Sequence, residues 1–190
     1  MTKPTQYYHP LNIMLHWLMA LFIPALFGVG LWMTGLDYYS SWYRTAPDLH
    51  KSFGILLAFL WLIRLLVVWL LGKPAAGGFG WQQKIAGWVH GLMYVLIMAI
   101  MVSGYLISTA DSRGIIVFGL FEVPGMGELF PEQADIAGTL HLYLAWGLII
   151  LIVLHAAAAL KHHYVDKDNT LTRMLGRHHA AASTTDKTEI

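Results

Sequence analysis

The sequence predicts an all-α membrane protein built as a bundle of four transmembrane helices, and three observations carry this prediction. Hydrophobic residues make up 57% of the 190 residues and charged residues only 12%, whereas a soluble domain is about one-quarter charged. Four apolar runs each reach the roughly 20 residues that a helix needs to cross the hydrocarbon core. Tryptophan and tyrosine are abundant and gather near the ends of these runs, as they do at membrane surfaces.

The four predicted spans cover about 12–35, 49–71, 85–109 and 136–160. The first, third and fourth contain no charged residue, while the second contains Lys51 and Arg64. We expect residues 1–175 to form one transmembrane domain. Residues 176–190 are small and polar and lack apolar periodicity, so we expect a disordered tail. The connection over 110–135 is acidic, and its apolar stretch IIVFGLF is expected at the membrane interface.

Composition also excludes several classes of function. The chain has no cysteine, which excludes disulfides, cysteine-ligated zinc, iron–sulfur clusters and covalently attached c-type haem. A net charge of +1 gives no reason to expect nucleic acid as a partner, and the lipid bilayer is the expected environment. The sequence has neither a G-x-G-x-x-G motif nor a P-loop, so no nucleotide cofactor is expected. The first apolar run is too long for a cleavable signal peptide.

The distribution of lysine and arginine predicts the orientation. If both termini and the 72–84 linker lie on one side, called inner, that side carries eight of these residues, against three on the outer side. Cytoplasmic segments are enriched in lysine and arginine, so we expect both termini in the cytoplasm. The inner set is Lys3, Lys73, Lys84, Lys161, Lys167, Arg173, Arg177 and Lys187, and the outer set is Arg44, Lys51 and Arg113.

Seven of the ten histidines lie in or beside the spans, where an ionisable group is costly and is by default a candidate for function. The other three, His9, His178 and His179, lie in the tails and read as solvated residues. By depth the seven form two layers. The outer layer holds His50 and His141, and the inner layer holds His16, His90 and His155, with His162 and His163 at the inner exit of the last span.

Helix geometry indicates that the last span serves both layers. His141 and His155 are fourteen residues apart, which is about 40° short of four full turns and ~21 Å along the axis. One helix face therefore presents an imidazole to each of two depths. The same step of fourteen links His50 to Arg64 and His90 to Gly104, and a glycine at outer depth is expected to leave room for a flat macrocycle.

Three explanations fit these layers. Histidines can hold membrane helices together by hydrogen bonds, or three inner-layer histidines could bind zinc. The third explanation is haem: two imidazoles from facing helices bind an iron porphyrin in a dry bundle core. We favour haem, because two layers each draw histidines from different helices and no carboxylate or cysteine accompanies them. Without cysteine such haem is b-type, and depth alone does not choose between His16 and His90 as the partner of His155.

Three segments resemble the bacterial cytochrome b561 family of four-helix, di-haem cytochromes of the inner membrane. They are IMLHWLMAL in the first span, LHKSFGILLAFLWLIRLL in the second, and LHAAAALKHHYVDKDNTLTRML at the end of the fourth. The similarity extends to about residue 175. It implies two haems b, with His16 and His155 on the inner iron and His50 and His141 on the outer iron.

The resemblance is to the superoxide oxidase type of this family, which implies an enzyme that passes electrons from superoxide to ubiquinone. The alternative is an electron carrier that links a dehydrogenase or hydrogenase to quinone, and a haem-free bundle is the third hypothesis. A second copy of the chain or a dehydrogenase subunit is the protein partner to consider. Arg64 is expected to contact a haem propionate, His90, His162 and Lys84 to serve quinone, and Lys51 to attract superoxide.

Overall fold

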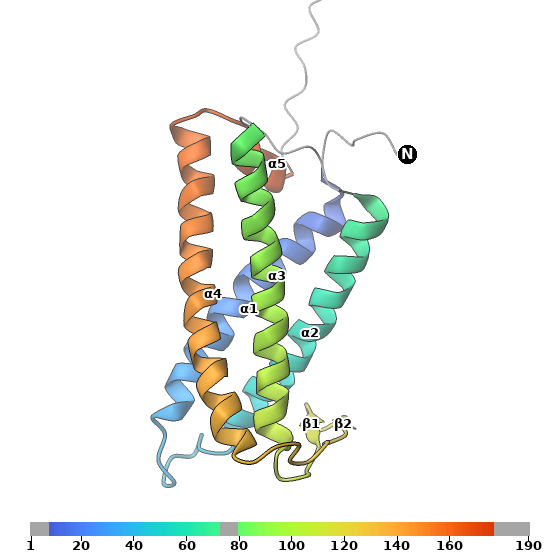
Figure 1. Cartoon of the computed structure of the whole chain (residues 1–190), viewed down its shortest axis with the longest axis vertical. Helices are drawn as coiled ribbons and strands as arrows, with labels where there is room; N and C mark the ends of the chain where they lie inside the picture. The colour runs from blue at the N-terminus through green and yellow to red at the C-terminus, as the bar shows by residue number, and fades with distance from the viewer. Residues whose placement is uncertain (1–7, 73–79, 177–190) are drawn as a thin grey trace, which may run out of the picture.

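The computed structural model describes residues 8–72 and 80–176. It contains four long helices, α1 (Pro10–Thr34), α2 (Thr45–Leu71), α3 (Gly80–Thr109) and α4 (Gln133–Tyr164), a short helix α5 (Thr170–Met174), and two strands, β1 (Ile115–Val117) and β2 (Phe121–Val123) (Figure 1). All four long helices are long and apolar enough to cross a membrane. The predicted four-helix membrane fold is therefore confirmed. The helices extend beyond most of the predicted apolar runs into their polar flanks.

Local sequence signals explain where several helices begin and end. Pro10 occupies the first turn of α1, where its missing N–H is not needed, and the ring of His9 accepts a hydrogen bond from the Leu11 N–H. Helix α2 ends at Leu71 and is capped by Gly72, which has a φ of +70°, a backbone conformation that glycine adopts without strain. At the start of α4, the buried Gln133 side chain accepts from Leu129 N–H and donates to the Leu106 carbonyl.

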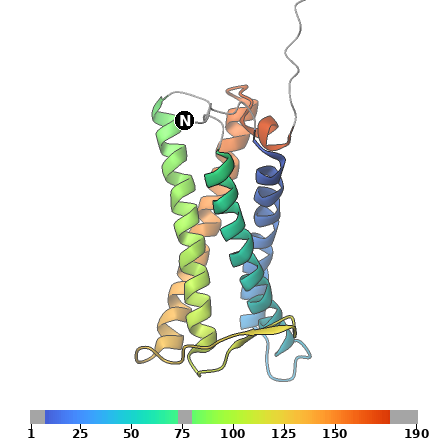
Figure 2. The ribbon, with the colours of Figure 1, turned by 90° about the vertical axis from the view of Figure 1, so that its right-hand side faces the viewer.

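The helices pack as two pairs. Helix α1 packs closely along α2 and α3 along α4, whereas α2 and α3 make far fewer contacts. Figure 2 shows the two pairs side by side, with α1 and α2 in one half and α3 and α4 in the other. A buried apolar cluster joins all four helices near mid-depth, and it consists of Met19, Ile23, Leu57, Trp61, Ile97 and Leu148. Any large group between the two halves must therefore lie above or below this cluster.

The outer end is closed by a β-hairpin that sequence reasoning missed. Strands β1 and β2 pair antiparallel, with Ile115 opposite Val123, and lie at the end of the bundle beneath α2 and α3 (Figure 1). Ile115 and Val117 are buried, while Ile116 is exposed. The expectation that the apolar stretch would simply lie at the membrane interface was therefore incomplete, because alternate side chains are buried within the protein.

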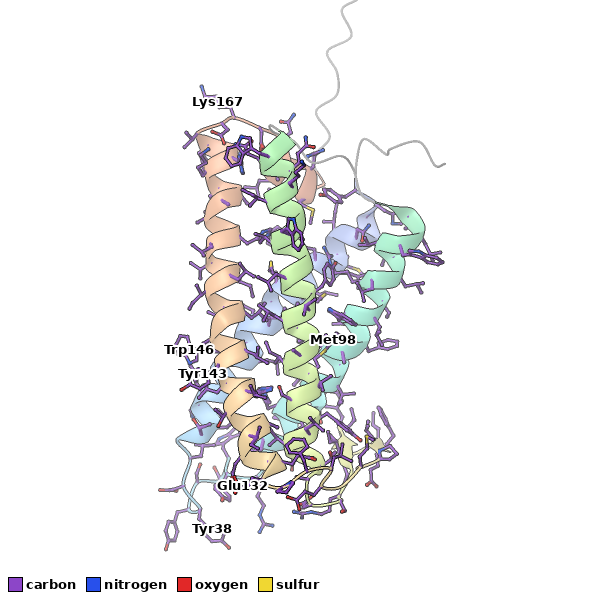
Figure 3. The ribbon with its side chains drawn as sticks, viewed as in Figure 1. Tyr38, Met98, Glu132, Tyr143, Trp146 and Lys167 are labelled. Carbon is purple, nitrogen blue, oxygen red and sulfur yellow. The ribbon has the colours of Figure 1, made fainter. Side chains whose placement is uncertain are left out.

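The inner end is held by α5. Trp17 of α1 donates its indole N–H to the carbonyl of Met174 at 2.8 Å, so the chain after α4 folds back onto the start of α1. Figure 3 shows Lys167 at this end and Tyr38 and Glu132 at the opposite end. The predicted disordered tail lies, apart from Gly176, outside the described residues.

Candidate functional site

Two pairs of imidazoles face one another across the gap between the two halves of the bundle. In the outer pair, His50 of α2 and His141 of α4 have ring centroids 6.2 Å apart, with planes at 72°. In the inner pair, His16 of α1 and His155 of α4 have centroids 6.5 Å apart, with planes at 71°. Each pair thus takes one ring from each half, and α4 contributes to both, as the spacing of its histidines predicts.

These separations match the span of a metal held between two imidazoles. Imidazole nitrogens bind transition metals at about 2 Å, and adding roughly 1 Å from each nitrogen to its ring centre puts the centroids about 6 Å apart. The pairs at 6.2 and 6.5 Å fit this value. The ring centroids of His90 and His155 are 5.1 Å apart, which is too close for a metal bound between the two rings. His90 also belongs to the same helix pair as His155 and is more exposed than the other four rings. Geometry therefore favours His16 as the partner of His155.

Each outer imidazole lies against a glycine of the neighbouring helix. A Cβ added to Gly30 of α1 would lie 3.2 Å from Cε1 of His50, and one added to Gly104 of α3 would lie 3.1 Å from Cε1 of His141. The expectation that Gly104 leaves room for a macrocycle is therefore incomplete. Its missing side chain first makes room for the imidazole itself.

The outer pair opens into an apolar cavity of about 850 Å³ lined by all four long helices, within the range of pockets that bind small molecules and cofactors. His50 and His141 lie in its walls, together with Gly30, Gly54 and Gly104. The mid-depth cluster closes one end through Leu57, Trp61, Ile97 and Leu148, and Ile115 of the hairpin also lines the cavity. A flat apolar group flanked by two imidazoles fits this space.

Outside the cavity the helices present apolar side chains to their surroundings. Figure 3 shows Tyr143 and Trp146 on the outward side of α4, and Met98 on α3. Tyr143 is 71% exposed and Met98 44% exposed, although Met98 also lines the cavity. An apolar surface of this kind is suited to contact with lipid. Met98 belongs both to this surface and to the cavity wall.

Arg64 has the partners that a guanidinium at inner depth requires. Its Nε donates to the Tyr94 hydroxyl at 2.9 Å and a terminal nitrogen donates to the Asn12 carbonyl at 2.8 Å. Within residues 8–72 and 80–176 no carboxylate forms an ion pair with it, so its positive charge is not neutralised there by the protein. Asn12 is 2% exposed, and its side-chain carbonyl oxygen has no hydrogen-bond partner in the part of the chain that the structure describes. An acceptor oxygen cannot bind a carboxylate, so the Arg64 guanidinium is the group here that could hold a haem propionate.

The other residues predicted for the inner site, His162 and Lys84, lie outside the facing imidazole pairs. His162 contacts the Asp166 carboxylate at 2.7 Å, and Lys161 binds the same carboxylate at 2.7 Å. Hydrogen bonds from Lys161, and then from His162, hold the pKa of Asp166 below its usual range. Lys84 is exposed on the first turns of α3. His162 therefore belongs to an ion cluster at the inner surface rather than to the facing imidazoles.

The outer cations are largely paired. Lys51, which lines the cavity, forms an ion pair with Asp48 at 2.9 Å. Arg113 forms an ion pair with Asp111, and its hydrogen bonds hold the pKa of that carboxyl below its usual value. Across the described part of the chain Arg44 takes part in no ion pair. Among the three outer cations, Lys51 is the one adjacent in sequence to His50, and it is also part of the cavity wall.

The structure gives the zinc alternative no support. Across residues 8–72 and 80–176, no group of three or more histidine, cysteine, aspartate or glutamate side chains has an arrangement that could hold a metal ion. The inner histidines His16, His90 and His155 approach one another pairwise but do not form such a cluster.

Comparison with known proteins identifies the family of this chain. The profile of the family described as prokaryotic cytochrome b561 matches residues 7–177. Cytochrome b561 homolog 2 of Escherichia coli K12 is 45% identical over 180 residues, which cover 93% of this chain and 95% of the relative. A protein of Yersinia pestis named probable superoxide oxidase CybB is 33% identical over 175 residues, 88% of this chain and 95% of the relative. Cytochrome b561 homolog 1 of Escherichia coli K12 is 28% identical over 170 residues, 87% of this chain and 95% of the relative.

The family match covers nearly the whole chain, and it coincides with four membrane-spanning helices whose histidines face one another in pairs. The chain belongs to the prokaryotic cytochrome b561 family, multi-pass bacterial membrane proteins that bind b-type haem and transfer electrons.

Proposed function

We propose that this protein binds two haems b and transfers electrons from superoxide to ubiquinone across the inner membrane. The observation that carries the proposal is the presence of two facing imidazole pairs, at 6.2 and 6.5 Å, at two depths of one bundle. His50 and His141 would bind the outer iron, and His16 and His155 the inner iron. When bound, the haems would supply one-electron chemistry at each depth.

The ligation limits the kind of chemistry at each site. Because two histidines would hold each iron, each haem would supply electron transfer rather than oxygen binding, and substrates would exchange electrons without becoming ligands of the metal. Ubiquinone takes two electrons and two protons to become ubiquinol. Two superoxide ions give up those electrons and leave as two molecules of oxygen, and the protons come from water on the side where quinone binds.

The outer end supports a superoxide site. Lys51 lines the cavity beside His50, and the carboxylate that pairs with it belongs to a side chain that is 66% exposed. Such solvent-exposed pairs are weak, with a strength of about 0–1 kcal/mol, so Lys51 remains able to attract an anion. The relative named probable superoxide oxidase supports the same substrate.

The inner end supports a quinone site. The ring centroids of His90 and His155 are 5.1 Å apart, closer than a metal held between them would allow, so we assign His90 to quinone rather than to the inner iron. Lys84 lies further along the same helix toward the inner surface. The cluster of His162, Lys161 and Asp166 lies at the inner surface and would relay protons between water and a reduced quinone, because an imidazole can both donate and accept a proton. Arg64 would hold a haem propionate.

The membrane orientation is part of the proposal. The count of eight inner against three outer cations favours a cytoplasmic inner end. Reporter fusions test this: a periplasm-active phosphatase joined after residue 190 is expected to be inactive, and the same reporter inserted in the 36–44 loop active. The reverse pattern would invert the assignment of the two substrate sites.

The ligand assignment is tested by the haem-to-protein ratio. We expect about two haems per chain in the wild type and about one in His50→Ala and in His155→Ala, since each haem needs both imidazoles. His90→Ala is the matched control, and its ratio should remain about two. If the ratio falls in His90→Ala but not in His16→Ala, His90 is the inner ligand. A ratio unchanged in His50→Ala would remove the outer site.

The substrate is tested by rapid mixing with superoxide. We expect haem reduction faster than spontaneous dismutation, and a slower, less salt-dependent reaction in Lys51→Gln, with Lys167→Gln at the opposite end as control. Absence of superoxide-driven reduction would favour the carrier alternative. Exposed apolar residues of the outer loops, Leu120, Phe121, Met126 and Leu129, are consistent with a docking partner for that role. A dehydrogenase or hydrogenase subunit that copurifies with the chain would then be expected.

A further inference from the structure

We propose that Ser103 is a positioning residue for the outer haem: its hydroxyl helps to fix the tautomer of His141 and lowers the reduction potential of the iron that this imidazole binds. The inference rests on the proposed ligation by His50 and His141. It concerns a residue of α3 that is 5% exposed and lies one residue before Gly104.

Hydrogen bonding fixes the protonated nitrogen of His141. Nδ1 lies 2.9 Å from the carbonyl oxygen of Ile100, and a carbonyl can only accept, so Nδ1 must carry the proton. The Ser103 hydroxyl donates to the same carbonyl at 2.9 Å and places its oxygen 3.1 Å from Nδ1. Its hydrogen is already engaged, so this oxygen faces the imidazole as a second acceptor. Nε2 is then the unprotonated nitrogen, which is the form that binds iron.

The opposite imidazole lacks this arrangement. Among residues 8–72 and 80–176, the buried Nδ1 of His50 has no hydrogen-bond partner in acceptable geometry, although the backbone of Leu26 lies near the ring. The outer pair is therefore asymmetric: two acceptors lie within 3.1 Å of Nδ1 of His141, whereas the backbone near His50 makes no hydrogen bond of comparable geometry with its Nδ1. A hydrogen bond from Nδ1–H makes the metal-binding nitrogen more basic. A more basic ligand favours the more highly charged ferric iron, which lowers the reduction potential.

This asymmetry has a consequence for the direction of electron transfer. An outer haem of lower potential gives up its electron more readily to an acceptor deeper in the bundle. Ser103 would therefore favour passage from the outer substrate site toward the inner one, at a position where it contacts neither substrate. Because Gly104 has no side chain, the His141 ring can approach α3 closely enough to contact Ser103.

The test is the midpoint potential of each haem in the purified holoprotein. Ser103→Ala leaves the Ile100 carbonyl as the remaining acceptor, so the equilibrium constant for reducing the outer haem should rise about tenfold, which is ~59 mV for one electron. The inner midpoint should not move, and Ser103→Thr should restore the wild-type value. The single wave that remains in His141→Ala identifies the inner haem.

Thr109→Val is the control, since this buried residue of α3 donates its hydroxyl to the Tyr105 carbonyl of its own helix. If Ser103→Ala does not retain the outer haem, Ser103→Cys, with a weaker acceptor of similar size, should show the rise. An unchanged outer midpoint in the variants that retain haem, or an equal shift in Thr109→Val, would overturn the role of Ser103 while leaving the ligation intact. Full haem content in His141→Ala would instead overturn the ligation, and this inference with it.

Discussion

At the scale of single residues, the outer site depends on side chains that are absent as much as on those that are present. Gly30 and Gly104 bring the backbones of α1 and α3 against the imidazoles of His50 and His141. Each glycine belongs to the helix that packs closely on the histidine's own helix. The rings are therefore backed by backbone on one side and face the gap between the two halves on the other.

Gly104→Ala should reduce occupancy of the outer haem. The added methyl group would lie 3.1 Å from Cε1 and 3.3 Å from Nδ1 of His141, closer than van der Waals contact allows, so the ring must move away from its hydrogen bonds. We expect the haem-to-protein ratio to fall toward one. Gly147→Ala is the control, since an added Cβ there meets nothing within 4 Å. Equal haem content in the two variants would show that the ring tolerates displacement.

The sequence predicted the histidine layers but not their surroundings. Spacing along one helix places His141 and His155 on one face, and the outer pair follows from depth. The choice between His16 and His90 requires the crossing of three helices, which no spacing within one helix contains. Ser103 was missed for the same reason: mid-helix serine is common in membrane spans, and only the approach of α4 makes its hydroxyl a partner of an imidazole.

At the scale of elements, the hairpin closes the outer end of the cavity. Ser52 of α2, two residues after His50 and 2% exposed, accepts a hydrogen bond from Phe118 N–H at 3.1 Å and donates to the Ile116 carbonyl at 3.4 Å. The turn places Phe118 and Gly119 at positive φ, +50° and +72°. Such a short hairpin is marginal alone, and the sequence offers no Asn-Gly or Asp-Gly turn signal, so its fold depends on α2.

Ser52→Ala should loosen the hairpin and leave the helices in place. Two backbone groups of the hairpin lose their buried partner, which costs about 1–3 kcal/mol for each unsatisfied group. We expect faster amide exchange over 115–123 and faster reduction of the outer haem by a small water-soluble reductant. Thr172→Ala, at the opposite end of the molecule, is the control and should change neither. Unchanged exchange over 115–123 would mean that packing of Ile115 and Val117 alone holds the hairpin.

The junction of α4 and α5 should respond to acid. Because hydrogen bonds from Lys161 and His162 lower the pKa of Asp166 below 3.8, its contribution to stability is present above that value and is lost as the pH falls through the lowered pKa. Exchange over 165–176 should therefore rise in acid in the wild type. In Asp166→Asn it should already be fast at neutral pH and less sensitive to acid. Asp37→Asn, at the outer end, should behave as the wild type in this segment.

At the scale of the whole molecule, the bundle is two helix pairs joined mainly through its centre. Six buried residues form the shared core, and the outer cavity of about 850 Å³ separates the halves on one side of it. Interiors are normally packed to the density of organic crystals, so a gap of this size marks a fold that is completed by what it binds. Length and composition predict four helices, but they do not predict that the halves are held apart.

Loss of haem should therefore weaken the association of the two halves more than the helices themselves. Each proposed ligand pair links α4 with α1 or α2, and a ligand bound only by the folded state stabilises that state. We expect the double variant His50→Ala, His155→Ala to show a lower thermal midpoint and faster exchange at the α2 and α3 faces that line the cavity, with helical content retained. His163→Gln, a histidine of α4 outside both pairs and outside the ion pairs of Asp166, should keep the wild-type midpoint. If the double variant lost haem yet unfolded at the wild-type temperature, the mid-depth core alone would be sufficient to hold the halves together.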